Sequence, residues 1–153
     1  MTFEDLRKSS SLFEDLGDRE FDLLTALARP LSVEQGTILF RADDPASRFY
    51  FVSKGLVALR ITTRSKPTMT IQTLGEGSLL GLSWRVPPYR WQWTAQAKQD
   101  SELIEFDANH ILAACEQDHE LDSAMWEMVA KEASKRLQHV RMQLLDIYGR
   151  ETS

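Results

Sequence analysis

The segment from Gly81 to Thr94 carries the side chains of this sequence that are best suited to binding a small ligand. Arg85 or Arg90 could bind an anionic group, because a guanidinium donates two parallel hydrogen bonds to phosphate or carboxylate. Tryptophans in the same segment could stack on a planar ring, which is worth about 1–3 kcal/mol for a nucleic-acid base. The candidate ligand-binding residues are Gly81, Leu82, Ser83, Trp84, Arg85, Arg90, Trp91, Trp93 and Thr94.

The same segment also permits an interpretation without a ligand. Its three tryptophans, together with Pro87, Pro88 and Tyr89, could fill a pocket with the protein's own side chains. The two prolines stiffen the chain and remove backbone N–H donors, which weakens an anion-binding loop. Ligand binding and a tryptophan-filled pocket therefore both stay open at this point.

Outside this segment, the residue types used in catalysis and metal binding do not form a motif. The three histidines, His110, His119 and His139, are too scattered for a pattern such as H-E-x-x-H. The single cysteine, Cys115, is interpreted as a small buried hydrophobe on a helix. The charged residues Glu132, Lys135, Arg136 and Arg141 are predicted to form the solvated face of a long helix, paired three and four residues apart. We expect no enzyme, no catalytic residue, no metal site and no required cofactor.

The elements that position these side chains fall into three parts of one domain, residues 1–153. Residues 1–30 predict two short helices, over Ser11–Leu16 and from Asp18 to Pro30. Residues 31–107 predict strands at 37–40, 49–53, 56–62, 68–74, near 91–97 and at 102–106, separated by Gly, Pro and Asp. Residues 108–149 predict a helix capped by Asp107 and a long helix from about Asp118 to Tyr148. The fold class is α+β, with a sandwich- or barrel-like region of short strands.

The last helix carries an apolar stripe. At 1.5 Å per residue, about 30 residues span about 45 Å, which is more than a small domain needs to cover one face. The stripe has heptad-like spacing and comprises Trp126, Val129, Ala133, Leu137, Val140, Leu144 and Ile147. It could pack on its own domain, but the length of the helix favours a homodimer through these residues.

Composition limits the partners and the location. The net charge of −5 disfavours nucleic acid as the main partner, because such binding depends on Lys and Arg that neutralise phosphates. The N-terminus lacks the pattern of a signal peptide, and no apolar run approaches the length of a membrane span. We expect a cytoplasmic protein with no membrane contact and no direct DNA binding.

Four stretches of the strand region carry a resemblance to a known family. They are GTILF at 36–40, FYFVSKGLV at 49–57, LGEGSLLG at 74–81 and TAQAK at 94–98. Their order resembles the cyclic nucleotide-binding domains of the catabolite-activator (CRP/FNR-like) and protein-kinase regulatory families, over about residues 12–148. The resemblance implies an antiparallel β-roll, also called a double-stranded β-helix or jelly-roll, with short N-terminal helices and a long C-terminal dimerisation helix.

The resemblance also implies two ligand-binding roles that this sequence does not fill. In the family, a Glu after the second glycine binds the ribose 2′-hydroxyl, and an Arg at the end of the loop neutralises the cyclic phosphate. These positions are Leu82 and Trp91 here. Leucine cannot accept a hydrogen bond, and tryptophan cannot neutralise phosphate. We therefore expect poor binding of cyclic AMP and cyclic GMP, and any anion would have to recruit Arg85 or Arg90.

The predicted function is a stand-alone regulatory or sensor module of signalling, with a ligand that is nucleotide-like or otherwise anionic. The family's helix-turn-helix is not expected, since the sequence ends shortly after Tyr148. Two alternatives stay open. One is a ligand-free protein-interaction or scaffold module with a tryptophan-filled pocket. The other is the sensor part of a longer transcriptional regulator.

Overall fold

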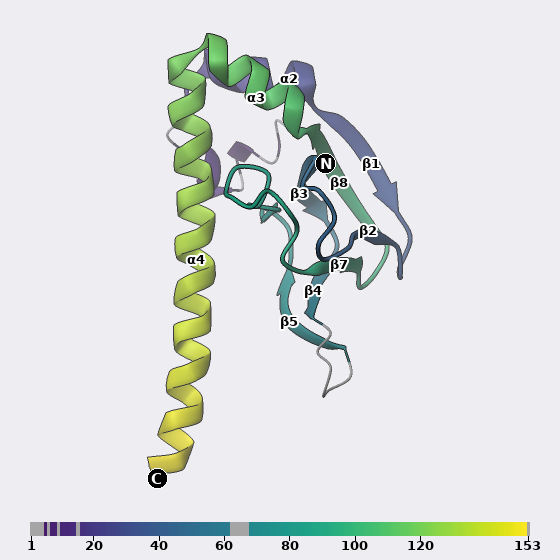
Figure 1. The fold of residues 1–153 in the computed structure, drawn as a ribbon, viewed down its shortest axis with the longest axis vertical. Coiled ribbons are helices and arrows are strands. Elements are labelled where there is room, and N and C mark those ends of the chain that lie inside the picture. The colour runs from purple at the N-terminus through teal and green to yellow at the C-terminus, as the bar shows by residue number, and fades with distance from the viewer. Residues whose placement is uncertain (1–4, 6, 9, 15, 62–67, 153) are drawn as a thin grey trace.

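Two antiparallel sheets form the β-roll in the computed structural model, which describes residues 5, 7–8, 10–14, 16–61 and 68–152, with backbone alone from 147 onward. Four strands make each sheet within this described part of the chain. The first sheet has the order β1 (Arg29–Val33), β8 (Ser101–Asp107), β3 (Arg48–Lys54), β6 (Leu79–Leu80). The second has the order β2 (Ile38–Phe40), β7 (Thr94–Ala97), β4 (Val57–Ile61), β5 (Met69–Leu74). Figure 1 shows the two sheets together on one side of the molecule.

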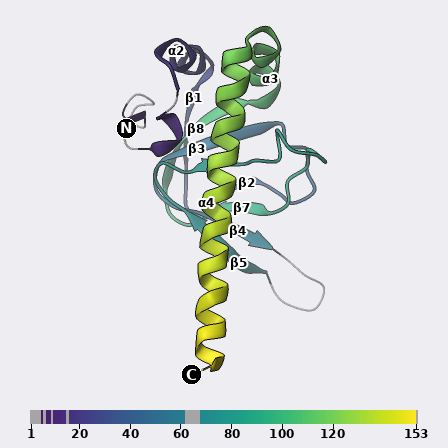
Figure 2. The ribbon, with the colours of Figure 1, turned by 90° about the vertical axis from the view of Figure 1, so that its left-hand side faces the viewer.

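Helices cover one end and one side of this roll. They are the 3-10 helix η1 (Ser11–Phe13), α2 (Asp18–Leu27), α3 (Ala108–Gln117) and α4 (His119–Thr152). The Asp107 carboxylate caps α3 by accepting hydrogen bonds from the N–H groups of Asn109 (2.9 Å) and His110 (3.2 Å). Figures 1 and 2 show that α4 runs along the roll and that its C-terminal part extends away from the strands. Within the described residues, no helix combines the length and the apolar character of a membrane span.

Stacked aromatic rings fill the core. Phe49 of β3 is fully buried between Trp84, at 4.3 Å between ring centroids, and Phe106 of β8, at 5.1 Å. Phe51 lies two residues further on the same strand and meets both Phe106 and Phe13 of η1. The N-terminal turn is therefore joined to the roll by apolar contacts, which stabilise roughly in proportion to the area they bury.

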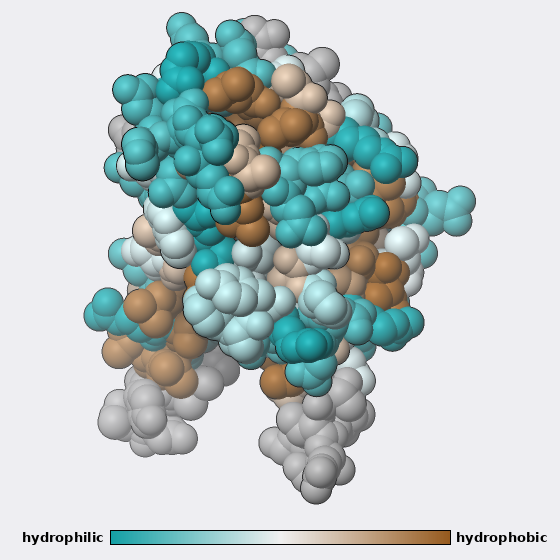
Figure 3. Space-filling model, turned by 45° about the horizontal axis from the view of Figure 1, so that its top comes forward, coloured by the Kyte–Doolittle hydropathy of each residue, from teal (hydrophilic) through white to brown (hydrophobic). Residues whose placement is uncertain are grey.

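The long helix presents different residues to the roll and to solvent. Leu121, Met125, Met128 and Glu132, spaced four, three and four residues apart, are buried. Exposed apolar side chains follow on the other side and along the protruding part: Trp126, Leu137, Val140, Met142, Leu144 and Leu145. In Figure 3, hydrophobic side chains gather on the protruding part of α4 beside its grey end.

The α+β fold with a β-roll and a long C-terminal helix is confirmed, and the differences lie at element boundaries and in two short strands that the sequence did not predict. The helix predicted to reach Pro30 ends at Leu27, and Pro30 lies within β1. Proline is tolerated there because β1 is an edge strand of its sheet. The helix expected over Ser11–Leu16 is a single 3-10 turn over Ser11–Phe13. β1 and the two-residue β6 were not predicted, since neither shows a clear alternation of apolar and polar residues.

Candidate ligand-binding site

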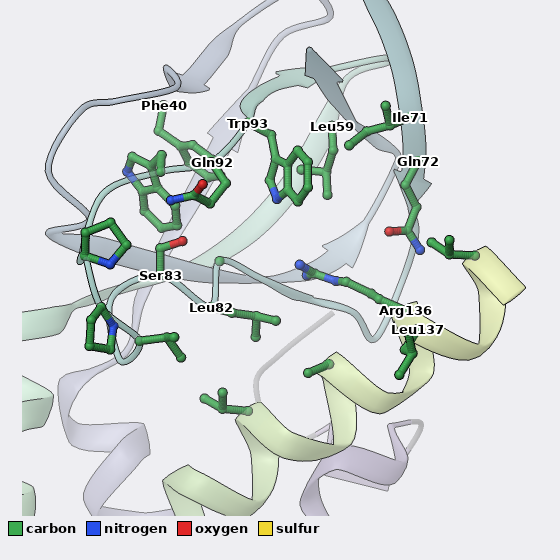
Figure 4. Close-up of a pocket in the computed structure, with 18 residues that line it drawn as sticks. Phe40, Leu59, Ile71, Gln72, Leu82, Ser83, Gln92, Trp93, Arg136 and Leu137 are labelled. Atoms are coloured by element: carbon green, nitrogen blue, oxygen red, sulfur yellow. The ribbon is translucent and has the colours of Figure 1, made fainter.

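A cavity lies between the segment that follows β6 and the inner side of α4. Its volume is about 620 Å³. Figure 4 shows side chains from β4, β5, the 81–93 segment and α4 converging on it. The wall comprises Phe40, Leu59, Ile71, Gln72, Gly81, Leu82, Ser83, Val86, Pro87, Pro88, Trp91, Gln92, Trp93, Val129, Ala133, Arg136, Leu137 and Val140.

This wall is apolar over most of its surface. The polar side chains in the wall are Gln72, Ser83, Gln92 and Arg136, and the tryptophans add their indole N–H groups. Among the described residues, Arg136 is the one charged side chain in the wall. The cavity is therefore suited to an apolar molecule that makes a small number of oriented polar contacts.

Arg136 projects from α4 into the cavity, and its guanidinium reaches the space between Leu82 and Trp93 (Figure 4). Its Nε donates to Oε1 of Glu132 at 3.4 Å, and its Nη2 donates to the carbonyl oxygen of Leu79 in β6. Burial lowers the pKa of Arg136, while the neighbouring Glu132 carboxylate opposes that shift. An arginine keeps its proton in proteins. The side chain is thus a largely buried cation that joins α4 to the strand before the 81–93 segment.

Glu132 supplies the counter-charge for this cation. It lies one helical turn before Arg136 and is completely buried, with 0% of its surface exposed. Its second oxygen, Oε2, is buried and has no hydrogen-bond partner among the described residues. A buried carboxylate needs a paired cation, because removing an isolated charge from water is unfavourable. Glu132 and Arg136 therefore form a charge-balanced pair at the edge of the cavity.

The tryptophans pack into the protein and leave the cavity open. Trp91 stacks on Phe40 with 3.8 Å between ring centroids, and 4% of its surface is exposed. Its ring lies against the backbone of Gly81, where a Cβ atom would be 2.6 Å from Cη2 of Trp91. Trp84 stacks on Phe49 and does not line the cavity. Trp93 forms part of the wall.

Five of the nine candidate residues meet at the cavity, and four do not. Those in the wall are Gly81, Leu82, Ser83, Trp91 and Trp93. Those outside it are Trp84, Arg85, Arg90 and Thr94. The hydroxyl of Thr94 accepts a hydrogen bond from the N–H of Ala42 at 3.1 Å.

The two arginines expected to supply a cation have other partners. Arg85 is buried, forms an ion pair with Asp122 of α4, and lies over the ring of Trp126, 4.4 Å from its centroid. Arg90 is exposed and donates to the carbonyl oxygen of Asp43 at 2.8 Å. Neither lines the cavity, so an anion bound in it would not contact either guanidinium.

The sequence pattern places Arg136, with Glu132, on the solvated face of the long helix and so does not identify it as a cavity residue. That assignment is wrong for both residues, since Glu132 is buried and the side chain of Arg136 is 14% exposed. The signal was present in the spacing. Apolar residues at 121, 125 and 128 continue at intervals of four to 132 and 136, so all five positions share one helical face.

The groups that most often carry chemistry lie away from the cavity. Among the described residues, no three His, Cys, Asp or Glu side chains are close enough together to hold a metal ion. Cys115 is buried in α3, and burial raises the pKa of its thiol to about 11. The thiol is therefore protonated near neutral pH and is a poor nucleophile.

Comparison with known proteins identifies a family and solved structures of the same fold. Residues 30–118 match the family described as Cyclic nucleotide-binding domain. Among curated proteins, no match was found. Among solved structures, a putative cyclic nucleotide-binding protein from Geobacter metallireducens has a TM-score of 0.78 at 18% identity, covering 90% of this chain and 99% of that one.

Two further solved structures are similar to this chain, and the first is the sensor domain of a transcriptional regulator. The sensor domain of DNR from Pseudomonas aeruginosa has a TM-score of 0.68 at 22% identity, covering 88% of this chain and 91% of that one. The catabolite activator protein of Thermus thermophilus has a TM-score of 0.68 at 25% identity, covering 92% of this chain and 63% of that one.

The contact between Gly81 and Trp91 gives a test of how the cavity wall is built. Gly81→Ala should destabilise the fold by about 2–5 kcal/mol, through a positive φ and a collision with the indole ring. Gly36→Ala is the matched control, because Gly36 also has a positive φ but has no atom within 4 Å of an added Cβ. It should cost about 1–2 kcal/mol. Urea unfolding followed by tryptophan fluorescence measures the free energy of unfolding of both variants. Equal losses of stability in the two would show that the Gly81–Trp91 contact does not shape the wall.

Proposed function

The chain belongs to the cyclic nucleotide-binding domain family, and we propose that it is a regulatory module whose cavity binds a small molecule other than cyclic AMP or cyclic GMP. The observation that carries this proposal is the wall of the cavity. The family's ribose-binding and phosphate-binding positions are Leu82 and Trp91, and both side chains face the cavity with no charge to offer.

Cyclic nucleotides are disfavoured by the electrostatics of this wall. A phosphodiester is an anion that needs a fixed cation when it is buried. Arg85 and Arg90 have partners elsewhere, and the charge of Arg136 is already balanced by Glu132. A cyclic nucleotide would therefore bring a net negative charge into an apolar space.

The helix that closes the cavity is also the part of the fold suited to passing on a signal. Ala133, Leu137 and Val140 line the cavity and belong to the stripe predicted to pair two copies. Trp126, Ala133, Leu137, Val140 and Leu144 are exposed on the chain by itself, whereas Val129 is buried against the roll. The side chain of Ile147 lies outside the described residues. We propose a homodimer through this stripe, so that a ligand against α4 would alter the packing of two helices.

A ligand-free scaffold is the second candidate function. It is supported by the exposed apolar side chains of α4, which would suit a protein partner whether or not the cavity is occupied. The open cavity of about 620 Å³ favours the sensor over a tryptophan-filled pocket. The same proposal includes a regulatory rather than a catalytic role, a cytoplasmic location, no membrane contact and no direct DNA binding. The net charge of −5 supports the absence of DNA binding, and the single cysteine is consistent with a reducing compartment.

A thermal-shift screen tests the sensor function. Cyclic AMP and cyclic GMP at millimolar concentration should leave the melting temperature unchanged, since neither Leu82 nor Trp91 can replace the family's Glu and Arg. Cyclic dinucleotides, linear nucleotides and uncharged apolar compounds complete the library, and a true ligand at 100 times its Kd should add about 2.7 kcal/mol of stability. Micromolar binding of cyclic AMP, checked by calorimetry, would overturn the proposal. A screen with no stabilising compound would favour the scaffold.

The dimer is tested separately. Wild type should sediment at about twice the monomer mass at micromolar concentration, because the exposed stripe of α4 is then buried. Leu137→Glu with Leu144→Glu should be monomeric, since opposed carboxylates would be buried without cations. The matched control is Gln138→Glu with Gln143→Glu, which adds the same charges to polar positions and should leave the dimer intact. A wild type that stays monomeric at every concentration would remove this part of the proposal.

A further inference from the structure

The charge balance of the cavity identifies a class of ligand. We propose that the cavity takes an uncharged, mainly apolar molecule that accepts a hydrogen bond from Arg136, in preference to an anion of similar size. This inference rests on the proposed function, since it names the ligand class of the same cavity. It also departs from the anionic ligand expected from the sequence.

The apolar part of the ligand follows from the wall. Phe40, Leu59, Ile71, Leu82 and Val129 surround the space with hydrocarbon. Trp93 adds a ring face that is only partly buried and points toward the cavity in Figure 4. A ligand gains from such a wall by removing its own apolar surface from water. A polar molecule would lose hydrogen bonds to water with few replacements.

The preference against anions follows from Glu132. Its carboxylate is completely buried beside Arg136, so the two charges of the pair cancel at the cavity edge. An anionic ligand would give this site one positive and two negative charges, removed from water together. The excess charge is unfavourable where the dielectric response is low. An uncharged ligand adds no such excess.

The polar contact follows from the free part of the guanidinium. The recorded hydrogen bonds of Arg136 use Nε toward Glu132 and Nη2 toward Leu79. In the described part of the chain Nη1 has no hydrogen-bond partner, and Figure 4 places the guanidinium tip within the cavity. A donor left without an acceptor when a ligand excludes water is unfavourable. A carbonyl or similar acceptor satisfies it without adding charge.

Three compounds on one skeleton test this inference on the wild-type protein. They are 2-acetylnaphthalene, which is an uncharged acceptor, 2-naphthoate, which is an anion, and 2-ethylnaphthalene, which has no acceptor. Equilibrium dialysis at pH 7.5 should rank the ketone at least about tenfold tighter than each of the others, a factor equivalent to about 1.4 kcal/mol. Equal or tighter binding of the carboxylate would overturn the inference.

Two variants separate the charge and the hydrogen bond. Glu132→Gln removes the counter-charge, so it should strengthen the binding of 2-naphthoate at least tenfold relative to that of 2-acetylnaphthalene. Arg136→Met should weaken the binding of the ketone about tenfold and change the Kd of 2-ethylnaphthalene by less than twofold, because it deletes the donor and keeps the apolar stem. Arg90→Ala is the matched control and should leave the affinity for all three compounds unchanged. Unchanged ligand ranking in folded Glu132→Gln protein, with folding checked by circular dichroism, would overturn the charge argument.

The outcomes distinguish this inference from the proposed function. Tight binding of the carboxylate with weak binding of the ketone overturns the ligand class and leaves a small-molecule sensor standing. Failure of all three compounds to bind wild type also overturns the ligand class. The sensor function then stands or falls on the broader thermal-shift screen. The wild-type ranking needs no variant, so it remains decisive even if a substitution at Glu132 or Arg136 prevents folding.

Discussion

The largely buried ion pair between Glu132 and Arg136 is the interaction on which the arrangement of α4 depends. Glu132 is completely buried, and a carboxylate in that place requires a cation beside it. Arg136 supplies the cation and donates to the carbonyl oxygen of Leu79 as well. Together with the buried apolar residues Leu121, Met125 and Met128, the pair therefore fixes the rotation of α4 about its own axis against the β-roll. Removing one partner of such a pair costs about 3–5 kcal/mol, so rotations that separate these contacts are strongly disfavoured.

This fixed rotation decides what the rest of α4 can do. It directs Val129 and Ala133 toward the cavity, and it leaves Trp126 and Leu144 exposed for a partner. The Gly81–Trp91 contact completes the opposite wall, because a glycine without a Cβ atom lets the indole ring approach the start of the loop closely. One helix thus carries the charge pair, a cavity wall and an exposed apolar surface. That combination supports the proposed coupling between a bound ligand and the association of two copies.

The fold was predictable from the sequence because short apolar runs, turn glycines and the Asp107 cap are local signals. The strand containing Pro30 was missed because its pairing with β8 is long-range and its own pattern resembles a helix end. The wall positions Leu82 and Trp91 could be placed from the resemblance. The cation could not, since Arg85 and Arg90 were near in sequence whereas Arg136 arrives from a helix more than 40 residues later. Charged residues at helical spacing also favoured a solvated face, and only the burial of Glu132 shows otherwise.

A double-mutant cycle on the free energy of unfolding tests this account most directly. Arg136→Met leaves Glu132 as a buried unpaired charge, and Glu132→Leu leaves Arg136 without its counter-charge. The double variant replaces the pair by two apolar side chains. We predict that the double variant is more stable than Arg136→Met alone, with a coupling energy of at least about 1 kcal/mol between the two substitutions. If the stability loss of the double variant equals the sum of the two single losses to within about 0.5 kcal/mol, the two residues act independently, and the pair does not hold α4 in place.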